Sequence, residues 1–115
     1  MKITKQTAEH YNWGDNCDGW HLVKTKHLSV IHERMPAHTE EERHYRSAAR
    51  QFFLVLSGSA VLEVDGERIT IHSQEGVEVP PQVPPQMMNE SDTDVEFIVI
   101  SQPESRGDRV IAQSI

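Results

Sequence analysis

Phe52-Phe53-Leu54-Val55-Leu56-Ser57-Gly58 is the stretch that decides the fold class. Five apolar residues of strand-favouring types run without interruption before a serine and a glycine. This pattern predicts a strand that is buried on both faces. A few residues later, segments 60–64 and 68–72 flank Asp65-Gly66, which is a strong signal for a two-residue hairpin turn. We therefore expect the middle of the chain to be β-structure.

Side chains that alternate with a period of two residues, as in a β-strand, also occur on both sides of this stretch. They extend the prediction of β-structure along the chain. Segments of strand character occur at residues 22–25, 28–35, 76–80 and 95–101. Residues 80–85 hold four prolines in six positions, which predicts a rigid loop because proline lacks a backbone donor. Helical character is limited to a single turn at residues 8–13. Many short strands separated by turns predict an all-β fold, a jelly-roll-like barrel.

Size and charge limit the function. The chain has 115 residues, which predicts one domain over residues 1–115. Its net charge of −7 argues against binding to nucleic acid and to anionic membranes, and no apolar run is long enough to span a bilayer. Because no secretory signal is evident and Cys17 is the only cysteine, we expect a cytoplasmic protein without an intramolecular disulfide. A domain this small gains stability from dimerisation, so we expect a homodimer that pairs through edge strands or sheet faces.

The order of the polar and glycine residues resembles the two motifs of the small single-domain cupins of the cupin 2, conserved-barrel type. The matching positions are His44, Gln51, Gly58, Gly76, Pro80 or Pro81, and Asn89. The resemblance covers a core of about residues 20–101, and the tail at 103–110 is in keeping with one bacterial subgroup. It implies a double-stranded β-helix with a pocket inside the barrel, where family members usually hold a divalent metal by three histidines and a carboxylate or amide.

Two of those ligand positions are replaced here, which gives a degenerate metal motif. Arg46 stands at the second histidine position and Pro85 at the third, while Gln82 replaces a motif glycine. Proline has no side-chain donor, and arginine stays protonated and offers no lone pair. A guanidinium about 4 Å from a divalent ion would repel it by up to about 8 kcal/mol at an effective dielectric near 20. We therefore expect no cofactor; a weaker alternative is a divalent metal held by His44 and Gln51.

The same replacement makes the expected pocket cationic. A guanidinium beside an imidazole and an amide favours an anionic or oxygen-rich molecule, and alternation along strands would bring these groups to one inward face above an apolar floor. The predicted ligand-binding residues are His44, Arg46, Gln51, Phe53, Met87 and Asn89. The first hypothesis is therefore a cupin that binds a small polar or anionic metabolite without redox chemistry. These residues favour a binding protein over an enzyme.

Structural roles compete with this interpretation at several positions. Arg46 is able to pair with Glu33 and fill the former metal site, and His44 is able to serve as a hydrogen-bonded barrel histidine. The amide of Asn89 suits a turn, since asparagine side chains commonly bond to nearby backbone.

Two other function classes also stay open. One is an enzyme: a metal-dependent dioxygenase or isomerase with rebuilt ligands, or a metal-free isomerase that uses His44. A displaced metal site would draw on His38, Glu42 or His32. The other is a structural or regulatory dimer with a filled barrel and no ligand.

Overall fold

The structure is a computed structural model that describes residues 1–42, 44–46, 49–103 and 109–111, with side chains described for all of these except 44–46 and 109–111. Residues 104–108 of the tail that matches a bacterial subgroup lie outside this description. The described residues form strands and no helix. The strands are β1 (Glu9–Trp13), β2 (Cys17–Lys24), β3 (Ser29–Met35), β4 (Thr39–Glu40), β5 (His44–Arg46), β6 (Arg50–Ser57), β7 (Ala60–Val64), β8 (Glu67–Ile71), β9 (Gly76–Val79), β10 (Pro85–Asn89), β11 (Val95–Gln102) and β12 (Arg109–Ile111).

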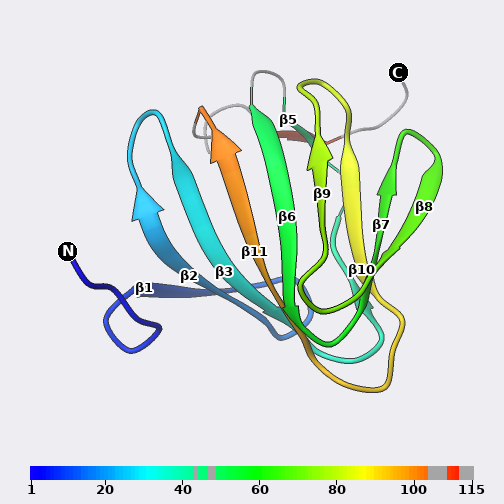
Figure 1. Ribbon diagram of the computed structural model, residues 1–115, viewed down its shortest axis with the longest axis horizontal. Coiled ribbons are helices and arrows are strands. Elements are labelled where there is room, and N and C mark those ends of the chain that lie inside the picture. Colours follow the sequence, from blue (N-terminus) through cyan, green and yellow to red (C-terminus); the bar gives the residue numbers. More distant parts are fainter. Residues whose placement is uncertain (43, 47–48, 104–108, 112–115) are drawn as a thin grey trace.

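The strands form two main antiparallel sheets. The larger has the order β1-β2-β3-β11-β6-β9, the smaller has the order β4-β10-β7-β8, and β5 pairs with β12. From β6 onward the chain passes to β7 and β8 in the smaller sheet, returns to β9, and then crosses to β10 and back to β11 (Figure 1). Because the chain from β6 onward passes back and forth between two facing sheets, the fold is the expected double-stranded β-helix.

The hairpin predicted at Asp65-Gly66 is confirmed. β7 and β8 pair antiparallel in register from Ala60 opposite Ile71 to Val64 opposite Glu67. Asp65 and Gly66 both have positive φ angles, 52° and 80°, as a tight hairpin turn between twisted strands requires. The local sequence therefore sets the register of this pair.

Gly58 ends β6 for a steric reason. Its φ of 83° lies in the left-handed region, and a Cβ there would stand 2.6 Å from the carbonyl oxygen of Asp94. Only glycine accommodates both the φ angle and this close approach. The turn after β6 is thereby held against the start of β11.

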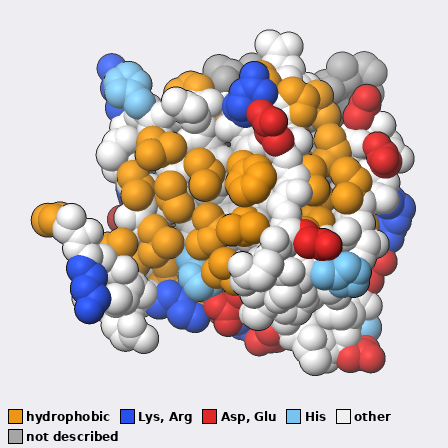
Figure 2. Space-filling model, viewed as in Figure 1, with side chains coloured by type: hydrophobic (Ala, Val, Ile, Leu, Met, Phe, Trp, Pro, Cys, Tyr) orange, Lys and Arg blue, Asp and Glu red, His pale blue; other side chains and the backbone are white. Residues whose placement is uncertain are grey.

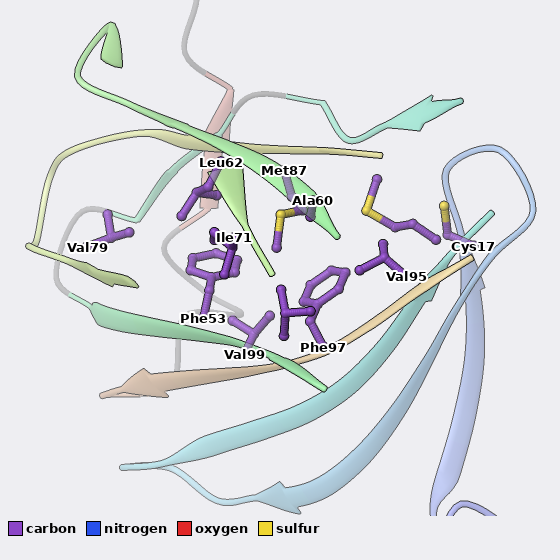
Figure 3. Packing of buried hydrophobic residues seen from close by; sticks show 12 residues of the cluster. Cys17, Phe53, Ala60, Leu62, Ile71, Val79, Met87, Val95, Phe97 and Val99 are labelled. Atoms are coloured by element: carbon purple, nitrogen blue, oxygen red, sulfur yellow. The ribbon is translucent and has the colours of Figure 1, made fainter. Parts of the chain in front are cut away.

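The core fills the space between the two sheets. Phe53 of β6 and Phe97 and Val99 of β11 point toward the smaller sheet (Figure 3). Val55 of β6 belongs to the same buried cluster. The rings of Phe53 and Phe97 lie 6.4 Å apart. From the smaller sheet, buried apolar side chains complete the core: Ala60, Leu62, Ile71 and Met87.

The prediction that residues 52–56 are buried on both faces is wrong for the single chain. Phe53 and Val55 are 3% and 0% exposed, but Phe52 is 37% exposed and Leu54 and Leu56 are half-buried. The smaller sheet covers only the inner face of β6. Alternate residues of an apolar run must then point outward.

The expectation of a helical turn at residues 8–13 is also wrong, because β1 occupies this segment. It pairs with β2 from Glu9 opposite His21 to Trp13 opposite Cys17. The indole Nε1 of Trp13 donates to the carbonyl oxygen of Asp18 at 3.0 Å. Pairing with a neighbouring strand outweighs weak local helical preference.

Candidate functional site

The inner face of the larger sheet presents its side chains in transverse rows. Gln51 of β6 lies opposite Ser101 of β11, and Ser101 lies opposite Ser29 of β3. We call these three residues the polar row. The next row inward, Phe53 opposite Val99, is apolar. A polar strip thus borders an apolar floor, which is the usual composition of a small-molecule site.

Gln51 is the central residue of this arrangement. Its side chain is 2% exposed, and its Nε2 donates to Ser101 Oγ at 3.2 Å. Its Oε1 is buried and accepts no hydrogen bond from any residue that the structure describes. Leaving a buried acceptor unsatisfied costs about 1–3 kcal/mol. Such an exception suits a group that awaits a partner from outside the described chain.

Phe53 and Met87 lie on opposite walls of the barrel below the polar row. Phe53 is 3% exposed and Met87 is 0% exposed, and both belong to the central apolar cluster (Figure 3). Both face inward as alternation along β6 and β10 requires. Contact of either residue with a ligand stays a prediction.

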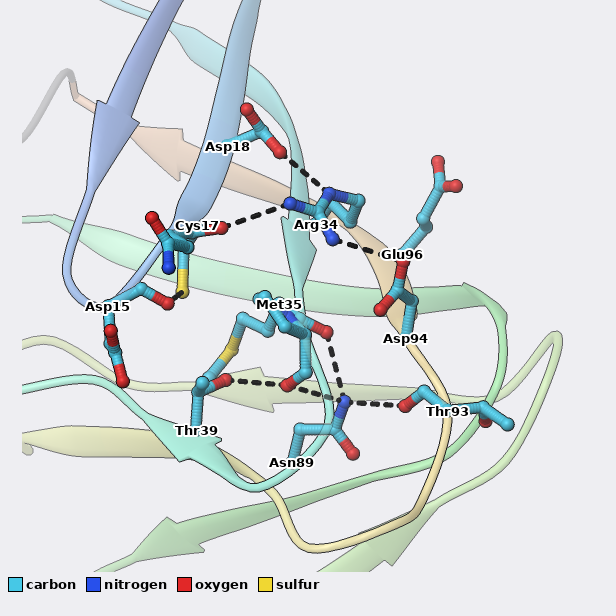
Figure 4. Close-up of polar contacts among 12 residues, drawn as sticks. Asp15, Cys17, Asp18, Arg34, Met35, Thr39, Asn89, Thr93, Asp94 and Glu96 are labelled. Carbon is cyan, nitrogen blue, oxygen red and sulfur yellow. Dashed lines mark hydrogen bonds and ion pairs between the residues drawn. The ribbon is translucent and has the colours of Figure 1, made fainter.

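Asn89 lies apart from this pair, as the last residue of β10 before the turn that leads to β11. Its Nδ2 donates to the carbonyl oxygens of Met35, Pro36 and Thr93 at 2.9, 3.1 and 2.8 Å (Figure 4). Its Oδ1 accepts from both the backbone and the hydroxyl of Ser91 at 3.0 and 2.7 Å. The amide therefore has no spare hydrogen and two filled acceptor positions, as expected of a turn former.

His44 and Arg46 are placed only by their backbone. β5 pairs with β12, with His44 opposite Ile111 and Arg46 opposite Arg109, and β5 contacts β10. The side chains of His44 and Arg46 lie outside the part of the chain that the structure describes. Their proposed roles, and the alternative pairing of Arg46 with Glu33, stay predictions.

Hydrogen bonds join Glu41, in the loop before β5, to β10. Glu41 Oε1 accepts from the backbone N–H of Met87 at 2.9 Å, while the N–H of Glu41 donates to the carbonyl of Met87 at 3.0 Å. Gln86 Nε2 also donates to the carbonyl of Glu41 at 3.0 Å. These bonds anchor the segment that leads to His44 beside the wall that carries Met87.

The residues named for a displaced metal site do not come together. His32 points to the outer face of the larger sheet, away from the barrel interior, and its Nε2 lies 2.7 Å from Glu96 Oε1. His38 is exposed and pairs with Asp92 at 2.9 Å. Among the residues whose side chains are described, no group of three or more His, Cys, Asp or Glu is arranged to hold a metal ion.

Sequence reasoning missed a second polar cluster on the inner face, formed by β1, β2 and β3. Tyr11 donates its hydroxyl to Glu33 Oε2 at 3.3 Å, and its ring lies 4.9 Å from that of His21. Gly19 makes room for this, since a Cβ there would stand 2.3 Å from the Tyr11 ring. Reading residues 8–13 as a strand opposite Gly19 would have signalled the cluster.

Electrostatic perturbations fall mainly on the outer face. Although partial burial opposes it, hydrogen bonds from Lys5 and His32 hold the pKa of Glu96 below its usual value. A hydrogen bond from His10 lowers the pKa of Asp18, and so does a further one from Arg34. Figure 4 shows the bond between Arg34 and Asp18. These carboxylates stabilise the sheet and lie on the side away from the polar row.

The architecture defines a class: a double-stranded β-helix with a polar row above an apolar interior. The sequence matches the family model described as cupin domain over residues 31–101. The chain belongs to the cupin family, and the resemblance seen in its motifs is confirmed. No functionally curated protein matches the sequence.

In the described residues, no helix has the length and apolar character that a membrane span needs.

Solved structures with the same fold carry different activities. A sugar phosphate isomerase of the cupin superfamily from Silicibacter pomeroyi has a TM-score of 0.76 at 18% identity, covering 90% of this chain and 76% of that one. A predicted oxalate decarboxylase from Thermotoga maritima has a TM-score of 0.83 at 14% identity, covering 90% and 100%. A polyketide cyclase from Streptomyces resistomycificus has a TM-score of 0.81 at 11% identity, covering 100% and 87%. At these identities the likeness extends to the fold alone.

Two described residues bear on the metal centre that the family resemblance implies, and the loss of that centre stays a prediction. Pro85, which the motif aligns with the third histidine, is buried at the start of β10 and has no side-chain lone pair. Gln51 offers one amide oxygen, a weak donor beside the imidazoles that transition metals favour.

Proposed function

We propose that the protein binds a small polar or anionic molecule inside the barrel, beside the polar row. The observation that carries the proposal is the buried Oε1 of Gln51, which lacks a partner among the described residues while Nε2 is held by Ser101. An unsatisfied acceptor calls for a donor, so the ligand should bring a hydroxyl or amide N–H to this atom.

Arg46 indicates that the ligand also carries an anionic group. In the cupin motif this residue follows His44 by two positions, and its guanidinium suits a carboxylate or phosphate through paired hydrogen bonds. The apolar floor of Phe53 and Met87 would receive the carbon skeleton. Together these groups favour a hydroxylated carboxylate or a sugar phosphate over a purely apolar compound.

A thermal-shift screen tests the proposal. Hydroxy acids and sugar phosphates should raise the melting temperature of the wild-type chain, by about 10 °C at a ligand concentration about 100 times Kd. Neutral apolar compounds of the same size should not. If no compound of either polar class shifts the melting temperature, the proposal fails.

Amino-acid substitutions test whether the ligand-induced rise in melting temperature arises from binding at the polar row. Gln51→Leu combined with Ser101→Ala removes both polar partners together, so the unliganded protein should keep its stability while the ligand-induced shift disappears. Gln6→Leu, at an exposed N-terminal position, is the matched control and should keep the shift. Arg46→Met should abolish the preference for the anionic ligand over its neutral analogue.

A further inference from the structure

Three glutamates in succession, Glu40-Glu41-Glu42, precede the strand that carries Arg46. On the face shown in Figure 2, Asp and Glu side chains stand at the surface around an apolar area. Glu40 and Glu42 are likewise exposed, whereas Glu41 between them is half-buried. Turning a carboxylate inward beside two others of the same charge is unfavourable unless hydrogen bonds compensate for the lost water. The hydrogen bonds of Glu41 therefore indicate a specific role.

Glu41 continues the pairing of β4 with β10 by one step. The two strands pair as far as Glu40 opposite Met88, so the next opposed residues are Glu41 and Met87. The N–H of Glu41 donates to the carbonyl oxygen of Met87 at 3.0 Å, as in a regular antiparallel ladder. The N–H of Met87, however, donates to the side-chain Oε1 of Glu41 at 2.9 Å, where a regular ladder would use the backbone carbonyl.

The side chain of Glu41 thereby lets the backbone turn away from β10. Its backbone carbonyl accepts from Gln86 Nε2 at 3.0 Å instead of from Met87. Pro85, two residues before Met87, has no N–H, so Met87 supplies the last backbone donor that β10 directs toward β4. Glu41 satisfies this donor and at the same time sets the direction in which the chain leaves the smaller sheet.

The direction of departure limits where β5 can stand. Arg46 follows Glu41 by five residues, in β5, whose backbone contacts β10. Five residues span at most about 17 Å, so β5 stays close to the point that Glu41 fixes. Met87, to which Glu41 is bonded, is 0% exposed and belongs to the apolar interior. One set of hydrogen bonds thus relates the position of β5 to the wall of the barrel.

We propose that Glu41 is a positioning residue for anion recognition: its bonds to Met87 hold β5 where Arg46 meets the anionic group of the ligand. This role rests on the binding function proposed above, and Glu41 itself does not touch the ligand. The sign of its charge makes the role testable. A carboxylate near the site repels an anion, so its removal would by itself tighten anion binding. Weaker anion binding after the loss of Glu41 therefore has to come from a displaced β5.

Calorimetry on the full chain tests the role with two matched pairs of compounds, glucose 6-phosphate with glucose and lactate with lactamide. Glu41→Ala should raise the Kd of the anionic member by about tenfold or more, the value of one charge-assisted hydrogen bond. The Kd of the neutral member should change by less than about threefold, because a neutral group gains little from the guanidinium. Glu41→Gln keeps an oxygen acceptor for the N–H of Met87 and should bind both members as the wild type does.

Glu75 offers a matched control in the turn between β8 and β9. Its N–H donates to the carbonyl oxygen of His72 at 3.0 Å, and its Oε1 accepts from the N–H of His72 at 2.8 Å. Glu75→Ala therefore removes the same charge and the same kind of bond at a place that does not lead to β5. It should leave every Kd unchanged.

Hydrogen exchange followed by mass spectrometry measures the hold on β5 without any added compound. Glu41→Ala should speed exchange of the backbone amides of Met87 and residues 44–46 by about tenfold or more, and Glu41→Gln and Glu75→Ala should not. If the wild type binds neither pair, anion recognition fails together with the binding function, while faster exchange would still support the hold of Glu41 on β5. Unchanged exchange in Glu41→Ala would overturn the role. An anion Kd that Glu41→Ala leaves unchanged, lowers, or raises no more than that of the neutral member would overturn it too, as would an equal loss in Glu41→Gln.

Discussion

Replacing Asn89 with alanine is expected to destabilise the fold by about 4 kcal/mol. The side chain is 1% exposed and joins the end of β3 to the turn that leads into β11 (Figure 4). Its NH₂ group shares two hydrogens among three carbonyls, and its oxygen accepts two bonds from Ser91. Four effective hydrogen bonds at about 1 kcal/mol each give the expected loss.

An aspartate at this position should be worse than alanine at neutral pH. It keeps the shape and the two accepted bonds, but it places a buried negative charge against three carbonyl oxygens that previously received hydrogens. Protonation in acid supplies one hydrogen, so the gap between Asn89→Asp and Asn89→Ala should narrow as pH falls toward 4.

Urea unfolding followed by tryptophan fluorescence measures both variants. Ser91→Ala removes one bond to Asn89 and one to the Thr93 carbonyl, and it should cost about 1 kcal/mol. Asn12→Ala is the matched surface control, because its exposed amide donates to Cys17 and Asp18; it should cost less than about 1 kcal/mol. If Asn89→Ala is no more destabilising than Asn12→Ala, the structural role assigned to this amide is refuted.

Two further predictions concern charge. Because the pKa of Glu96 is lowered in the fold relative to its usual 4.5, its bonds to Lys5 and His32 should stabilise the protein above about pH 4.5, and this stability should vanish as pH falls through the lowered value. The stability gap between wild type and Glu96→Gln should therefore close in acid, and a constant gap from pH 7 to 3 would contradict this. Arg46→His with Pro85→His should raise divalent-metal affinity, measured by calorimetry against the wild type, by at least about a hundredfold, since loss of the guanidinium relieves up to about 8 kcal/mol of repulsion. Unchanged affinity would mean that the two positions do not face one pocket.

The fold was largely predictable because local and tertiary signals agree. The turn at Asp65-Gly66 and the alternation along residues 95–101 each indicate a strand, and each also matches the register that the sheets adopt. The segment at 8–13 was not predictable in the same way. Its strand character depends on pairing with Cys17–Lys24, whereas its own composition carries no clear period.

The candidate site was predictable only in part. Strand alternation was sufficient to expect Gln51 and Phe53 on one face of β6. The hydrogen bonds of Asn89 depend on where the carbonyls of Met35 and Thr93 lie, which no sequence spacing encodes. The exposure of Phe52 was also beyond the sequence, because an apolar run predicts that both faces are covered and does not say whether the same chain covers them.

The alternation along β6 has an evolutionary consequence. Gln51, Phe53 and Val55 face the interior, and Phe52, Leu54 and Leu56 face outward. Point mutations at the two sets are able to accumulate separately, so a lineage could change what the interior accepts while keeping its outer surface, or the reverse. A one-residue insertion or deletion in β6 would exchange the inward-facing and outward-facing sets of side chains. Selection should therefore remove such length changes from β6 and tolerate them in the flanking turns.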